Sequence, residues 1–340
     1  EALSYALGTF FLGVDGVPSR SLQESEKRRL TLSENSFEVQ LPFSISVQHS
    51  LLGKKYHWKR GTNKEKGGAT TWKDAKQLIN VAKTLTQDVR SGGKINLPLI
   101  AYYGTGRLAR EKHQKLAYAK QGSRLEGYDI ALDPATCKKR FLSWFKSFED
   151  AKLKFNKDSS LYHAFTQAIT GLVPDWNKIH FSWEMDDMVG QLENGEWMPF
   201  SDLSDGYQNV VRLAADIAYR AITLNPHLAE NAIVKAEGVV LIDEIDMHLH
   251  PTWQKNIISD LKKTFPNIQF IITTHSPFIV QSLKANEVIN LDGAVLTDDP
   301  ETLTLEDNSL FMGVNDPNST RFIKKAEAAE KYLELLDQGD

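Results

Sequence analysis

The stretch Gly238-Val-Val-Leu-Ile-Asp-Glu-Ile-Asp-Met-His-Leu-His-Pro251 decides how the rest of the chain is interpreted. Its apolar run, Val239 to Ile242, follows a glycine, and a short apolar run of this kind is typical of a strand buried on both faces of a parallel sheet. Asp243 and Glu244 come directly after it. Carboxylates seldom end a buried strand without a charge to bind, so the stretch predicts a ligand site at the carboxyl end of a strand. The alternative is a strand followed by a solvated acidic turn.

Composition limits the class of protein. The 340 residues are 41% hydrophobic and 25% charged, which is typical of a soluble globular chain with room for one large or two ordinary domains. The net charge of −4 provides no overall case for nucleic-acid binding. The single cysteine, Cys137, excludes an internal disulfide and a cysteine-based zinc site, and favours a cytoplasmic location. We expect no membrane helix, because no apolar run approaches the necessary ~20 residues, and no signal peptide.

A second apolar run, Ile268 to Ile272, predicts another buried strand, which ends in Thr273-Thr-His275. An amphipathic helix is expected between the two strands, from Trp253 to Phe265. Helices alternating with strands that end in polar residues indicate an α/β fold, with a mostly parallel sheet and its site along one edge. His275 is therefore a candidate functional residue, although a lone histidine is more often structural.

The segment Leu203-Ser-Asp-Gly-Tyr-Gln208 predicts the start of a helix that runs to about Asn225-Pro226. Ser204 and Asp205 are typical N-cap residues, and a helix is expected after Gly206. Unpaired N–H groups and the positive end of the helix dipole make such a start a favourable anion site. An ordinary capped helix is the alternative.

The first hundred residues predict a helix at 1–12, a half-exposed strand at 37–48 with a partner strand at 56–59, a helix at 72–90 and a strand at 95–103. Pro42 favours an edge position or a bulge for the strand at 37–48. Residues 54–66 mix six basic residues with Tyr56 and Trp58, a pattern that either binds nucleic acid or forms a solvated hairpin. Arg107 follows a predicted strand and a Gly-x-Gly, so it could contact a phosphate or a partner, or pair with an acid.

Residues 108–195 predict a helical lobe, since charges and helix formers dominate there. Phe141, Trp144, Phe145 and Phe148 share one helix face, which indicates internal packing or a surface for docking a partner. A hairpin turned at Asn194-Gly195 is expected within 179–200. A charged helix is expected at 318–337 in the C-terminal tail. The predicted division is 1–107, 108–195, 196–284 and 285–340.

These motifs together resemble the ABC-type ATPase heads of the SMC/RecF/OLD group. Residues 203–208 resemble the ABC signature, 239–244 resemble Walker B, 245–251 occupy the D-loop position, and 274–277 resemble the H-loop. Similar bacterial ATPases carry an inserted helical lobe, and some, such as those of Septu and retron-linked systems, act in anti-phage defence. The resemblance implies an ABC-ATPase head with an antiparallel β subdomain and an inserted helical lobe.

The resemblance also implies roles for the matching residues. Asp243 would bind Mg²⁺, Glu244 would be the general base, and His275 would contact the γ-phosphate of ATP. Ser204 and Gly206 would bind the γ-phosphate held by an opposing copy, so the active form would be a head-to-head homodimer with ATP between the copies. Asp246 would lie near that dimer interface.

Several positions depart from the family pattern. The phosphate-binding loop Gly-x-x-x-x-Gly-Lys-[Ser/Thr] occurs nowhere in the 340 residues. Residues 1–12 resemble the helix that follows this loop, so the resemblance implies that a P-loop precedes Glu1 in the full protein and that the chain alone binds nucleotide poorly. Tyr103-Gly-Thr-Gly-Arg107 stands where a Q-loop glutamine is expected, and Asp205 replaces a signature glycine.

Three functions compete. The first is an ATP-hydrolysing switch that passes its signal, through the 108–195 lobe, to an effector such as a nuclease. The second is a scaffold or sensor that binds a partner protein or nucleic acid without needing hydrolysis. The third, an OLD-type nuclease, is disfavoured because only 65 residues follow His275. A transition-metal site at Asp243, His248 and His250 is also disfavoured, since histidines two residues apart do not share a helix face.

Overall fold

The computed structural model describes residues 2–21, 26–33, 36–64, 73–108, 122–133, 138–155, 159–173, 176–291, 293, 295–296 and 298–314. The chain divides into two compact units, one formed by residues 1–249 with 260–273 and the other by 250–259 with 274–340. The predicted division at residues 107, 195 and 284 follows composition and motifs, and it stays a prediction.

A three-stranded parallel sheet forms the centre of the first unit. Its strand order is β10 (Ile268–Ile272), β9 (Gly238–Ile242) and β5 (Leu99–Tyr103), so β9 pairs with a strand on each side. A Cβ at Gly238 would lie 1.9 Å from the Leu99 carbonyl oxygen, and only glycine therefore permits this close approach. The predicted α/β fold and the parallel sheet are confirmed.

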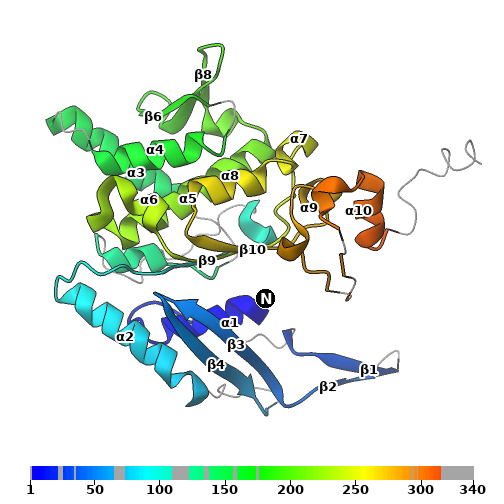
Figure 1. The fold of residues 1–340 in the computed structure, drawn as a ribbon. Coiled ribbons are helices and arrows are strands. Elements are labelled where there is room, and N and C mark those ends of the chain that lie inside the picture. The colour runs from blue at the N-terminus through cyan, green and yellow to red at the C-terminus, as the bar shows by residue number, and fades with distance from the viewer. Residues whose placement is uncertain are drawn as a thin grey trace, which may run out of the picture. The chain divides into compact units, whose positions relative to one another are not determined.

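Helices cover one face of this sheet (Figure 1). They are α5 (Asp205–Leu224), α4 (Ser160–Thr170), α3 (Lys138–Phe155) and the short α6 (Ala232–Lys235). Phe141 and Phe145 of α3 are fully buried, and the Trp144 ring packs against Phe165 and Tyr219. Phe141 and Phe145 of the predicted stripe are thus internal packing, whereas Trp144 and Phe148 are half-buried, so a partner contact on this part of the stripe stays a prediction.

On the other side of the central sheet lie α1 (Ala2–Phe11), α2 (Lys76–Arg90) and an antiparallel hairpin of β3 and β4, and a second hairpin, of β1 and β2, projects beyond them (Figure 1). β3 (Phe43–Leu51) pairs with β4 (Lys54–Thr62), and β1 (Arg29–Ser33) pairs with β2 (Ser36–Val39). The single strand predicted at 37–48 was wrong, because the chain breaks between β2 and β3 at Pro42, which has no N–H to donate to a ladder.

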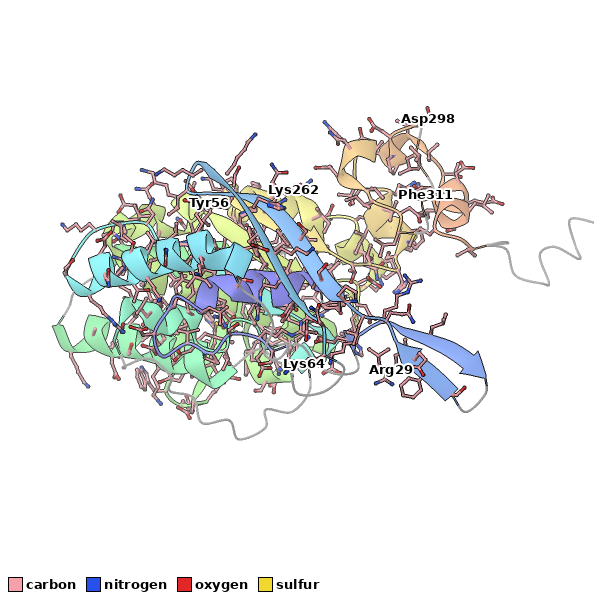
Figure 2. All side chains as sticks on the ribbon, turned by 90° about the horizontal axis from the view of Figure 1, so that it is seen from below. Arg29, Tyr56, Lys64, Lys262, Asp298 and Phe311 are labelled. Atoms are coloured by element: carbon pink, nitrogen blue, oxygen red, sulfur yellow. The ribbon has the colours of Figure 1, made fainter. Side chains whose placement is uncertain are left out.

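The basic segment on β4 is divided between the interior and the surface. Tyr56, Trp58 and Arg60 are buried, and the Arg60 guanidinium lies 4.1 Å from the centre of the Tyr5 ring. Lys55 and Lys59 face solvent on the opposite side of the strand. Figure 2 shows Tyr56 on this hairpin and Arg29 on the neighbouring one. The aromatic residues are therefore part of the core, and no basic-aromatic surface for stacking nucleobases exists on this strand.

The hairpin predicted at 179–200 is a three-stranded antiparallel sheet of β6 (Lys178–Ser182), β7 (Asp187–Gln191) and β8 (Trp197–Pro199). Gly195 has a φ of 88° and lies in the predicted turn, which joins β7 to β8. An additional turn, which includes Asp186 with a φ of 48°, joins β6 to β7. This second turn was not predicted, because it contains neither glycine nor proline.

The second unit contains α7 (Pro251–Gln254), α9 (Pro277–Val280) and α10 (Leu305–Phe311). The helix predicted from Trp253 to Phe265 is two helices, α7 and α8 (Ile257–Thr264), and α8 extends into the first unit. Short 3-10 helices occur at Lys73–Ala75, Thr105–Leu108, Arg124–Tyr128, Phe200–Asp202, Pro226–Asn231, Ala285–Glu287 and Pro300–Thr302. Among the described residues no helix is long and apolar enough to cross a membrane. The helix predicted at 318–337 lies outside the described residues.

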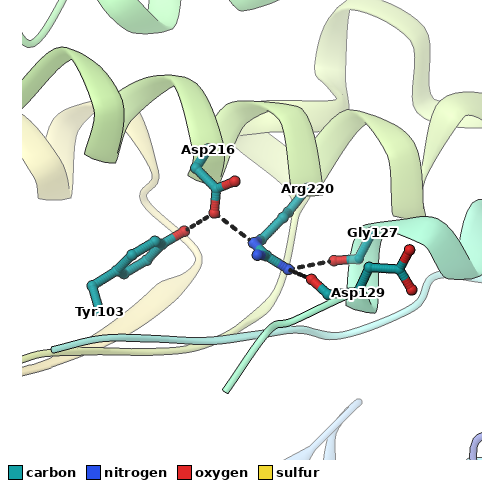
Figure 3. Close-up of polar contacts among 5 residues, drawn as sticks. All are labelled: Tyr103, Gly127, Asp129, Asp216 and Arg220. Carbon is teal, nitrogen blue, oxygen red and sulfur yellow. Dashed lines mark hydrogen bonds and ion pairs between the residues drawn. The ribbon is translucent and has the colours of Figure 1, made fainter. Parts of the chain in front are cut away.

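A buried polar network joins α5 to β5 (Figure 3). Asp216 Oδ2 accepts hydrogen bonds from the Tyr103 hydroxyl (2.8 Å) and from Arg220 Nε (2.7 Å). Arg220 Nη1 also donates to the carbonyl oxygens of Gly127 (2.8 Å) and Asp129 (3.2 Å). The network ties two segments, β5 and residues 127–129, to a helix that lies far from both in the chain.

His49 on β3 makes the stability of the first unit depend on pH. It borders a small apolar cavity beside Leu7 and Trp58, and burial lowers its pKa below the ordinary 6.5. In the unfolded chain His49 becomes protonated near pH 6.5, whereas in the folded chain it stays neutral to a lower pH. The free energy of unfolding therefore decreases as the pH falls below about 6.5. We expect His49→Gln to weaken this decrease, as measured by urea unfolding at pH values from about 7.5 to 5. Parallel pH curves for the two proteins would contradict the prediction.

Candidate functional site

The turn after β9 places two carboxylates at the carboxyl end of the central strand. The Asp243 N–H donates to the Tyr103 carbonyl (2.8 Å), which extends the pairing with β5 by one residue. Thr273, at the end of β10, donates from Oγ1 to Asp243 Oδ1 (2.5 Å) and accepts from the Glu244 N–H (2.9 Å). Both acids are half-buried. The structure thus confirms the predicted position of these acids and adds Thr273, which no sequence pattern had indicated.

The backbone of this turn is strained. Glu244 has a φ of 46° and His248 a φ of 63°, a left-handed conformation that costs an L-residue about 1–2 kcal/mol. Strain of this kind persists only where surrounding contacts hold it, and it is concentrated at functional sites. The structure therefore gives Glu244 a fixed backbone direction at the edge of the sheet.

Arg107 supplies much of that support. Its side chain is buried, with 2% exposed, and it donates from Nη1 to the Asp243 carbonyl and from Nη2 to the Glu244 carbonyl, both at 2.6 Å. Burial lowers the pKa of its guanidinium, whereas the Asp243 and Glu244 charges raise it. The printed hydrogen bonds of Arg107 to the turn go to backbone carbonyls, and the nearby Asp243, Glu244 and Asp246 charges agree with the suggested pairing with acids. The suggested contact with a phosphate or partner stays a prediction.

The start of α5 lies against the same turn. A Cβ at Gly206 would come within 2.2 Å of the His248 carbonyl oxygen, so the helix and the turn approach each other as closely as a glycine allows. Ser204 occupies the N-cap position and is exposed, and its hydroxyl makes no capping hydrogen bond. The helix start with its exposed Ser204 thus lies at one end of the turn that carries the acids.

Asn209 connects the start of α5 to its surroundings. It is 4% exposed, its Oδ1 accepts from Arg107 Nε (2.8 Å), and its Nδ2 donates to the Met247 carbonyl (3.2 Å). A polar residue among the mostly apolar buried positions of α5, which also include Asp216 and Arg220, is the one signal by which the sequence could have indicated Asn209.

The remaining predicted site residues are less closely defined. Asp246 lies in the turn and is half-buried, and its carbonyl accepts from the Leu249 N–H (2.9 Å). His275 belongs to the second unit, so its predicted approach to the site in the first unit stays a prediction. The next residue, Ser276, caps α9 and donates to Gln254 Oε1 (2.5 Å).

The donor set suits Mg²⁺ better than a transition metal. In the described part of the chain no three His, Cys, Asp or Glu side chains gather as a metal cluster, and His248 and His250 are both exposed. Mg²⁺ is usually bound by only one or two protein carboxylates together with substrate phosphates and water. Asp243, with one oxygen held by Thr273 and the other available, fits that role.

The chain matches a protein family and is similar to several known proteins. The family model described as "AAA domain, putative AbiEii toxin, Type IV TA system" matches residues 84–281. The chain is 29% identical over 244 residues to the "Retron Vc95 probable ATPase" of Vibrio cholerae serotype O1 biovar El Tor, covering 57% of this chain and 47% of that protein. It is 48% identical over 136 residues to the "Septu protein PtuA" of Bacillus mycoides (strain KBAB4), covering 40% of this chain and 17% of that protein. The chain thus spans less than half the length of these relatives.

A solved structure is also similar to the chain. The SMC head bound to the C-winged helix domain of ScpA has a TM-score of 0.42 and 14% identity, covering 81% of this chain and 79% of that one.

Proposed function

The chain belongs to the family described as "AAA domain, putative AbiEii toxin, Type IV TA system", and from that premise we propose that the full protein is an ATP-hydrolysing switch that acts as an ATP-gated dimer. The observation that carries the proposal is the turn after β9, where Thr273 and Arg107 hold Asp243 and Glu244 at the edge of the sheet. Similarity to the retron and Septu proteins supports a role in anti-phage defence.

Each residue of the turn has a defined task in this mechanism. Asp243 would hold Mg²⁺, which neutralises phosphate charge when it is bound. Glu244 would accept a proton from the attacking water, and its strained backbone keeps the carboxylate in place during the reaction. His275 would donate to the γ-phosphate of ATP.

The start of α5 would act on an opposing copy. Ser204 and Asp205 at the start of α5 are exposed, and the positive end of a helix dipole favours an anion there. They lie at the far end of the turn from Glu244, so one chain would offer its acids to one nucleotide and its helix start to another. Asp246, within the turn, would lie near the contact between copies.

The proposal includes an effector protein, such as a nuclease, that docks on the lobe at 108–195. Phe141 and Phe145 of the aromatic stripe are buried and cannot contact an effector, whereas Trp144 and Phe148 are only half-buried. Trp183 and Met185, in the turn between β6 and β7, are 41% and 53% exposed and provide the apolar contact surface that such docking needs. The alternative, a scaffold or sensor that does not need hydrolysis, rests mainly on the absence of a phosphate-binding loop from the 340 residues.

A complementation experiment tests the composite site. Glu244→Gln and Ser204→Arg should each abolish ATP hydrolysis by the full protein. After subunit exchange, a mixture of the two variants should recover roughly a quarter of the original rate, because half of random dimers are mixed and each mixed dimer has one intact site of two. Recovery requires that Glu244 and Ser204 at one site come from different copies. If the mixture stays inactive although mixed dimers are detected by native mass spectrometry, the two residues do not share a site in this way.

A further inference from the structure

A buried side-chain link joins three segments of the first unit: the 3-10 helix after β5, the turn after β9 and the start of α5. Arg107 donates from its guanidinium to Asn209 Oδ1 (2.8 Å) and to the carbonyls of Asp243 and Glu244 (2.6 Å each). Asn209 in turn donates to the Met247 carbonyl (3.2 Å). Two side chains therefore contact the carbonyls of the turn near both of its ends.

Arg107 determines the direction of the backbone on both sides of Glu244. The carbonyls of two consecutive residues point at one planar guanidinium, which has donors in a rigid fork. Consecutive carbonyls converge on one group only if the residue between them departs from extended geometry, and Glu244 does so with a φ of 46°. The orientation of these two peptides sets where the Glu244 side chain leaves the backbone.

Asn209 ties the same guanidinium to α5. It lies in the second turn of this helix, after Gly206, which packs directly against the His248 carbonyl. Because interiors are close-packed, a displacement of the helix start is passed to the turn through both of these contacts. The helix start that carries Ser204 and the turn that carries Glu244 are thus mechanically connected within one chain.

We infer that Arg107 and Asn209 are positioning residues that hold Glu244 in its working conformation and couple it to the signature segment of the same chain. The inference rests on the proposed function. In a dimer whose two sites each combine parts of both chains, this link would let the helix start that binds phosphate in one site adjust the base of the other site.

Steady-state ATP hydrolysis by the full protein tests the inference. Arg107→Lys keeps the charge but has one nitrogen in place of the planar fork whose Nε, Nη1 and Nη2 each contact a different acceptor. We expect kcat to fall roughly 10- to 100-fold while KM for ATP changes less than about threefold, since misplacement of a catalytic group by about 1 Å has an effect of this size. A rise in KM with kcat unchanged would overturn the inference and would make Arg107 a nucleotide contact.

Arg124 provides a matched control for a purely structural role. It also donates to three backbone carbonyls, those of Leu224 (2.7 Å), Gly93 (3.0 Å) and Ile95 (2.5 Å), and none of these belongs to the turn. We expect Arg124→Lys to lower the melting temperature and to leave kcat unchanged. If Arg107→Lys behaves in the same way, Arg107 supports the fold alone and the inference fails.

A double-mutant cycle tests the coupling itself. If Arg107 and Asn209 act through one link, Asn209→Ala should lower kcat further by less than about threefold in the Arg107→Lys background. If the double variant loses kcat by the product of the two single-variant losses, the coupling is overturned. Glu244→Gln, measured alongside, distinguishes failure of the proposed function from failure of the inference. If Glu244→Gln does not slow hydrolysis, the proposed function fails. If Glu244→Gln slows hydrolysis but Arg107→Lys does not, only the inference is rejected.

Discussion

Replacing Glu244 with glutamine is expected to slow ATP hydrolysis by the full protein about 100- to 10,000-fold, which is the range for loss of a general base. Glutamine has the size and shape of glutamate, so it preserves the packing of the strained turn, but its amide cannot accept a proton from water. Binding of ATP and dimerisation should persist, because neither depends on proton transfer. Single-turnover hydrolysis and the molar mass of the protein with ATP, measured together, should show slow chemistry in an intact dimer.

Glu237 offers a control at the opposite end of the same strand. It is an exposed glutamate directly before Gly238, and its carbonyl accepts from the Leu99 N–H (2.8 Å). Glu237→Gln makes the same chemical change without touching the carboxyl end of the sheet, so hydrolysis should continue at the original rate. Hydrolysis by Glu244→Gln at the rate of Glu237→Gln would contradict the assignment of Glu244 as the base.

The second large effect concerns stability and the network of Figure 3. Asp216→Ala is expected to lower the free energy of unfolding by about 3–5 kcal/mol, since it leaves the Arg220 guanidinium buried without its counter-charge. The side chains of Asp216 and Arg220 are 0% and 3% exposed, so water cannot replace the lost partner. Denaturant unfolding, with the midpoint and slope fitted together, measures the loss.

Tyr103 and Arg220 in this network both keep their protons at neutral pH. Burial raises the pKa of the Tyr103 hydroxyl well above 10, and the Asp216 charge raises it further, so Tyr103 remains a donor. Burial alone would lower the pKa of the Arg220 guanidinium, but the Asp216 charge more than offsets this and the pKa lies above its ordinary value. The loss on Asp216→Ala should therefore be nearly independent of pH between about 6 and 9.

An exposed pair of the same spacing serves as the control. Asp150 and Lys154 of α3 are also four residues apart, at 3.8 Å, with side chains 41% and 66% exposed. Asp150→Ala should cost less than about 1 kcal/mol, because exposed ion pairs are weak. A double replacement, Asp216→Leu with Arg220→Met, should recover much of the loss, since it removes both buried charges. Equal losses for Asp150→Ala and Asp216→Ala would show that burial does not strengthen the inner pair.

Much of the fold could be predicted because its signals are local. The apolar runs that became β9 and β10, and the periodic apolar residues of α5, report burial directly through their spacing. The position of Asp243 and Glu244 could be predicted for the same reason, since charged residues directly after an apolar run indicate the end of a buried strand at the edge of the sheet. Errors occurred where a local signal was weak or misleading, as at the turn around Asp186 and at Pro42.

The sequence by itself determined the central strand, the order of the motifs and the placement of Asp243 and Glu244 at a carboxyl end, because residue period and neighbouring residues carry that information. Only the tertiary structure decided that Arg107 supports the turn and that Asn209 links it to α5. It also showed that Thr273 orients Asp243 and that Asp216 is paired inside the protein. The physical reason is that each of these contacts joins segments far apart in the chain, and a polar residue's partner is set by how helices and strands pack, which no local pattern records.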